Sequence, residues 1–77
     1  MDQAQITATI ARVLAEAETV RDDTTRTDAA RQLAKDAIAQ LAHARDFAAA
    51  GAPADRIEAA ISSAKHLVVL AATTSKL

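Results

Sequence analysis

Apolar residues recur every three or four positions along most of the chain, which is the period of an amphipathic α-helix and not of a strand. In the first third this stripe consists of Ile6, Ile10, Val13, Ala17 and Val20, with Leu14 widening it. Asp2 precedes the stripe, and Asp is a favoured N-cap residue. The pattern therefore predicts a first helix over residues 3–20.

Two further stripes with the same period follow. The second consists of Ala30, Leu33, Ala34, Ala37, Leu41, Ala44 and Ala48, and the third of Ile57, Ala60, Ile61, Ala64, Val68 and Ala71. They predict helices over residues 27–50 and 55–73. Asp55 and Glu58 have the spacing of a capping box at the start of the third helix. Because the second stripe is mostly Ala, its helix can approach a neighbour closely.

Two breaks separate the three predicted helices. Gly51 and Pro53 form a strong stop, because Gly adopts the left-handed cap conformation and Pro cannot continue a helix. The weaker break is the polar segment 21–28, after which Thr25 or Thr27 begins the second helix. Short connections favour antiparallel neighbours. The fold class is therefore all-α: one domain, residues 1–77, forming a three-helix antiparallel bundle or a helical hairpin with an extra N-terminal helix.

The core that these helices can build is small. The chain has 77 residues, of which 51% are hydrophobic, but 22 of these are Ala and only 17 are larger. Domains of this size usually need a disulfide, a metal or a partner subunit for stability. The absence of Cys excludes disulfides and thiolate zinc sites. We therefore expect homo-oligomerisation to complete the bundle.

The run from Leu67 to Ala72 is apolar all round its helix. At about 100° per residue, Leu70 points away from the Val68 face and Val69 lies to one side. We therefore predict an oligomer or partner interface at Leu67, Val69 and Leu70, with Ile38 and Phe47 as weaker additions. The alternatives are simple exposure near the C-terminus and, for Phe47, a plug that closes the bundle beside the turn.

The charge and hydropathy of the sequence argue against several classes of partner. The formal net charge is −1 and the signs are mixed, so no basic surface for nucleic acid is expected. No segment approaches the roughly 20 apolar residues that cross a membrane. Residues 1–11 lack the basic and apolar regions of a signal peptide. These features favour a cytoplasmic protein.

No residue pattern indicates catalysis or a metal. His43 and His66 lack metal-ligand spacing, and Asp22, Asp23 and Asp28 lack the pattern of a calcium loop. Neither a cofactor nor an enzymatic activity is therefore expected. A possible anion site comprises Arg45, Arg56, Lys65 and His66.

These observations predict a small non-catalytic protein-binding module, of the adaptor, inhibitor or antitoxin type, that docks a helical face on a larger protein. Its many Ala residues and its excess of Arg over Lys are typical of a GC-rich genome or of a phage that infects such a host, so phage origin is a further hypothesis. One alternative is an oligomer that sequesters an anionic small ligand, such as a signalling nucleotide, at subunit boundaries. Another is a structural assembly subunit.

Overall fold

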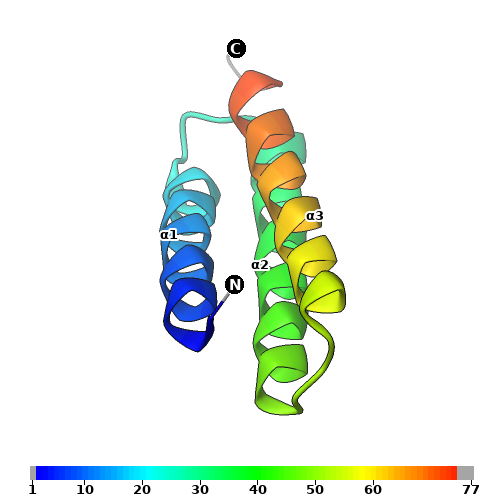
Figure 1. Cartoon of the computed structure of the whole chain (residues 1–77). Helices are drawn as coiled ribbons and strands as arrows, with labels where there is room; N and C mark the ends of the chain where they lie inside the picture. Colours follow the sequence, from blue (N-terminus) through cyan, green and yellow to red (C-terminus); the bar gives the residue numbers. More distant parts are fainter. Residues whose placement is uncertain (1, 75–77) are drawn as a thin grey trace.

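The computed structural model describes residues 2–74, which form three α-helices: α1 (Gln3–Asp22), α2 (Asp28–Ala49) and α3 (Ala54–Thr73). The helices alternate in direction and form an elongated bundle of 41 × 16 × 15 Å (Figure 1). The turn between α2 and α3 lies at one end, and the connection between α1 and α2 lies at the other. The all-α prediction is confirmed, and each helix end lies within two residues of its predicted position.

Two of the three helix starts are capped by side chains. Asp2 accepts a hydrogen bond from the Gln5 backbone N–H (2.8 Å), and the Gln5 side chain accepts one from the Asp2 N–H (3.2 Å), which makes a capping box. Thr27 caps α2 by accepting a hydrogen bond from the Ala30 N–H (3.2 Å). These contacts confirm Asp2 as a cap and select Thr27 over Thr25.

The capping box predicted for Asp55 and Glu58 is wrong. The N-cap of α3 is Pro53, and no side-chain hydrogen bond caps this helix. Pro has no N–H to satisfy and a φ already suited to a helix start, so the helix begins directly after it. Asp55 instead lies in the first turn, where its negative charge interacts favourably with the helix dipole.

The turn between α2 and α3 is a Schellman motif built on the single glycine. Gly51 has a φ of +75°, a conformation that residues with a Cβ rarely adopt. The Ala52 N–H donates to the Phe47 carbonyl (2.9 Å), and the Gly51 N–H donates to the Ala48 carbonyl (3.2 Å). The predicted stop at Gly51 is thus confirmed.

The predicted stripes form the core. The buried apolar side chains are Ile6, Ile10, Val13, Ala17, Val20, Ala30, Ala34, Ala37, Leu41, Ala44, Ile57, Ala60, Ile61, Ala64, Val68 and Ala71. This set contains every predicted residue of the first and third stripes except Leu14, which is half-buried at the edge of the first. In the second stripe, Leu33 and Ala48 are half-buried at its edges. The most extensive helix pair is α2 with α3, and α1 contacts α2 more than it contacts α3.

The connection between α1 and α2 is held by two arginines. The Arg31 side chain donates to the Arg21 carbonyl (2.9 Å) and so joins the start of α2 to the end of α1. Arg26 forms an ion pair with Asp23 (3.2 Å) and donates to the Ala72 carbonyl at the end of α3 (3.4 Å). The last carbonyls of a helix have no partner within the helix, so Arg26 fixes this end of α3 to the connection.

Asp23 also organises this connection, and its pKa lies below the ordinary value of 3.8. The main causes are hydrogen bonds from the hydroxyl and the backbone N–H (3.0 Å) of Thr25, which favour the ionised carboxylate. A group with a lowered pKa in the folded state stabilises the fold above its unfolded pKa. That contribution is lost as the pH falls through the folded-state pKa, here below about 4.

We therefore expect Thr25→Val to raise the pKa of Asp23 toward its ordinary value, and to reduce the loss of stability below about pH 4. The measurement is an NMR titration of the Asp23 carboxyl carbon, with urea unfolding at several pH values. Thr24→Val is the matched control, because the threonine hydroxyl that donates to Asp23 belongs to Thr25 and not to Thr24. An unchanged Asp23 titration in Thr25→Val would show that the hydrogen bond from the Thr25 hydroxyl does not lower the pKa.

Candidate functional site

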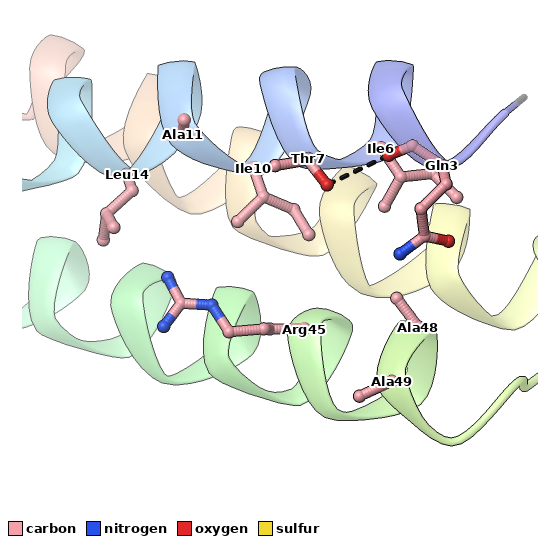
Figure 2. Close-up of a pocket in the computed structure, with 9 residues that line it drawn as sticks. All are labelled: Gln3, Ile6, Thr7, Ile10, Ala11, Leu14, Arg45, Ala48 and Ala49. Carbon is pink, nitrogen blue, oxygen red and sulfur yellow. Dashed lines mark hydrogen bonds between the residues drawn. The ribbon is translucent and has the colours of Figure 1, made fainter.

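An apolar groove runs between α1 and α2 and has a volume of about 260 Å³. We call it the α1–α2 groove. Figure 2 shows its lining side chains: Gln3, Ile6, Thr7, Ile10, Ala11, Leu14, Arg45, Ala48 and Ala49. The α1 residues follow a spacing of three and four, so they lie along one edge of that helix. On α2, small Ala side chains face them, and this leaves the space open.

Arg45 is the only charged residue among those that line the α1–α2 groove. Its guanidinium extends along α2 toward Leu14, while Gln3 lies at the opposite end of the groove (Figure 2). The Thr7 hydroxyl donates to the Gln3 carbonyl within α1 (2.9 Å), so that donor is already used. The groove therefore has an apolar middle, a cation at one end and an amide at the other.

A second, more polar groove lies between α1 and α3. Its volume is about 230 Å³, and Thr9, Glu58, Ile61, Ser62 and Lys65 line it. Glu58 and Lys65 give this groove one charge of each sign. It therefore offers less attraction to an anion than the α1–α2 groove does.

The structure does not bring the four predicted anion-binding residues to one pocket within a single chain. Arg45 lines the α1–α2 groove, and Lys65 lines the groove between α1 and α3. Arg56 and His66 are exposed and line neither. An anion site that used all four would need a second copy of the chain.

The predicted interface residues fall into two groups. Val69 and Leu70 are the large apolar side chains that the structure leaves exposed within residues 2–74, at 59% and 38%. Leu67, Ile38 and Phe47 are half-buried and pack against the core. The packing of Phe47 beside the α2–α3 turn favours the plug interpretation, and its ring also lies 6.5 Å from that of His43.

The exposed surface of α3 around Val69 and Leu70 carries little charge. From Ala59 to Thr74, the exposed residues are Ala59, Ser62, Ser63, Lys65, His66, Val69, Leu70, Ala72, Thr73 and Thr74. Lys65 is the one Lys, Arg, Asp or Glu in this set. We call this set of exposed residues the α3 face. The start of α3 lies outside this face and exposes Asp55, Arg56 and Glu58. The residues exposed on α2 include Asp28, Lys35, Asp36, Arg45 and Asp46.

Within residues 2–74, no group of three or more His, Asp or Glu side chains could together hold a metal ion. None of the three helices combines the length and the hydropathy needed to cross a membrane. Comparison of the chain with protein-family models, curated proteins and solved structures found no match.

The α1–α2 groove was not predicted from the sequence, although Arg45 was selected for its charge. One signal was available: Ala48 and Ala49 stand on α2 where a larger pair would fill the space beside α1. The pattern alone does not show which helix these Ala residues face. In contrast, the α3 face could be predicted from the sequence, because it consists of residues of the third helix that lie outside its buried stripe.

Proposed function

We propose that this protein is a small non-catalytic binding module that self-associates through the α3 face and docks on a larger protein. The single observation that carries this proposal is the exposure of Val69 and Leu70 on a face with one formal charge. Depletion of charged residues distinguishes the centre of a protein interface from ordinary surface. The α2 surface, which is rich in charges, lacks this property.

The α3 face suits a second copy of this chain. It follows α3 from Ala59 to Thr73, a length of about 21 Å, and the α3 helix of a second copy would cover all of it. The small side chains of Ala59, Ser62 and Ser63 would allow two α3 helices to approach closely. In this proposal the second copy covers Val69 and Leu70 and completes the bundle.

We further propose the kind of partner that this protein binds and the cellular setting in which it acts. A module with a helical binding face and no catalytic constellation suits an adaptor, an inhibitor or an antitoxin, and a phage protein of the cytoplasm is the setting that we propose. Docking of one helical face on an apolar surface of the partner is the mode of recognition.

Leu70→Glu is expected to dissociate the self-associated protein, because a carboxylate buried in an apolar interface loses its hydration without gaining a partner. Sedimentation velocity at one protein concentration should show a fast species for the wild type and an 8.0 kDa monomer for the variant. Ala39→Glu is the matched control, since Ala39 is exposed on α2 and lies outside the α3 face.

The proposal requires that the control sediments like the wild type. Equal sedimentation of all three proteins as monomers would contradict self-association. Dissociation by both variants would show that added charge, and not the α3 face, is responsible. Circular dichroism of each variant establishes that the helices are intact.

A further inference from the structure

The α1–α2 groove has the dimensions of a channel for one extended chain. Leu14 lies eleven positions after Gln3, so the groove follows α1 for about 16 Å. Its volume of about 260 Å³ is just below the usual range for ligand pockets. A single alkyl chain suits a long apolar groove of this small volume.

The residues that line the groove indicate the chemistry of the ligand. Ile6, Ile10 and Leu14 offer apolar side chains along most of the length, and Ala48 contributes a methyl group from α2. No Asp or Glu lines the groove, and Arg45 is the one cation among its lining residues, with its guanidinium toward the Leu14 end. The ion pairs found within residues 2–74 involve Arg21 and Arg26, and Arg45 is in none of them. Its guanidinium is therefore available to a carboxylate.

We infer that the α1–α2 groove binds a medium-chain alkyl carboxylate, with its chain along Ile6 and Ile10 and its carboxylate on Arg45. An extended chain advances about 1.25 Å per carbon–carbon bond, which follows from the 1.5 Å bond length. Decanoate is then about 11 Å long and fits between Gln3 and Leu14. The chain length that binds best should fall near this value.

This inference is independent of self-association. The groove begins at the N-terminal end of α1, beside the C-terminal end of α2. Val69 and Leu70 lie near the C-terminal end of α3, at the other end of the bundle (Figure 1). The Leu70→Glu protein should therefore bind decanoate as the wild type does, so failure of one proposal leaves the other standing.

The test is an NMR titration of the whole chain with decanoate, decanol and decyltrimethylammonium, each below its aggregation concentration. We expect saturable shifts confined to the groove residues, centred on Ile6, Ile10 and Ala48. Decanoate should bind about fivefold more tightly than decanol, the effect of one solvent-exposed Arg–carboxylate pair. The cationic probe should bind most weakly. No saturable binding, or equal binding of all three probes, would overturn the inference.

Two pairs of variants locate the site. Arg45→Gln should remove the preference for decanoate over decanol, whereas Arg56→Gln, at an exposed position outside the groove, should leave it unchanged. Ala11→Phe should fill the groove and weaken the binding of decanoate and of decanol at least tenfold. Ala15→Phe is its control, because Ala15 is exposed on α1 but does not line the groove. Binding that is unaffected by Arg45→Gln and Ala11→Phe would overturn the inference.

Discussion

The Leu41→Ala protein is expected to lose about 3 kcal/mol of unfolding free energy, the larger of the two strongest effects that we predict. Leu41 is 2% exposed and is among the largest fully buried side chains of the bundle. Truncation removes its apolar contacts and leaves a cavity that rigid neighbouring helices fill only in part. For a chain of this length the total stability is about 4–12 kcal/mol, so the loss is a large fraction of it.

Thermal unfolding checks this value, with an expected fall in melting temperature of about 12–24 °C. All proteins must be compared at one concentration, because self-association stabilises the folded state by mass action. Leu33→Ala is the matched control, since Leu33 is half-buried on the same helix. It should lose about 1 kcal/mol. Equal losses for both variants would contradict the central position of Leu41.

The second large effect is expected from Ala37→Leu, which should destabilise the bundle by about 2 kcal/mol although it adds an apolar group. Ala37 is fully buried on α2, in a seam that also contains Ala30, Ala34 and Ala44 at 0% exposure. A larger side chain at this seam must push α2 away from its neighbours or adopt a strained rotamer. We therefore expect the seam to require Ala, because the full burial of these four residues indicates little room for a larger side chain.

Ala39→Leu is the control for the seam. It makes the same chemical change two positions along the helix, at an exposed site. Its unfolding free energy should stay within about 0.5 kcal/mol of the wild type. Urea unfolding of the two variants measures the difference. An unchanged or increased stability of Ala37→Leu would show that the seam has room for larger side chains, and that close approach of α2 is not required.

The helices and the core were predictable because both depend on local periodicity. The third stripe, from Ile57 to Ala71, is buried in full, since an apolar stripe this regular can be covered in only one way by neighbouring helices. The start of α3 was misplaced because Pro53 begins the helix without a side-chain cap. Local capping rules favour Asp55, but the fixed φ of Pro at the preceding turn decides the boundary.

The groove was not predictable because it depends on the relative position of two helices. Helical projection shows that Arg45 lies beside the buried stripe of α2, but not which helix passes that side. The same limit explains why Arg45 and Lys65, both selected for charge, lie in different grooves. Exposure of Val69 and Leu70 could be predicted, because their directions on α3 leave no position for a covering helix of the same chain.

Two separate surfaces of the bundle have different expected ligands. The α3 face has exposed apolar side chains and one charge, and we propose that it binds a second copy of this chain. The α1–α2 groove is narrow and apolar with one cation, and we infer that it binds an alkyl carboxylate. Because the groove exists only in the folded bundle, binding of such a ligand would stabilise the fold by mass action.

Self-association is the central claim, and sedimentation equilibrium of the unaltered chain tests it most directly. One chain has a mass of 8.0 kDa. Over a concentration series from micromolar to millimolar, we predict a mass that rises to at least twice that of one chain and reaches a plateau, as a closed symmetric oligomer requires. A mass of one chain at every concentration would contradict the account.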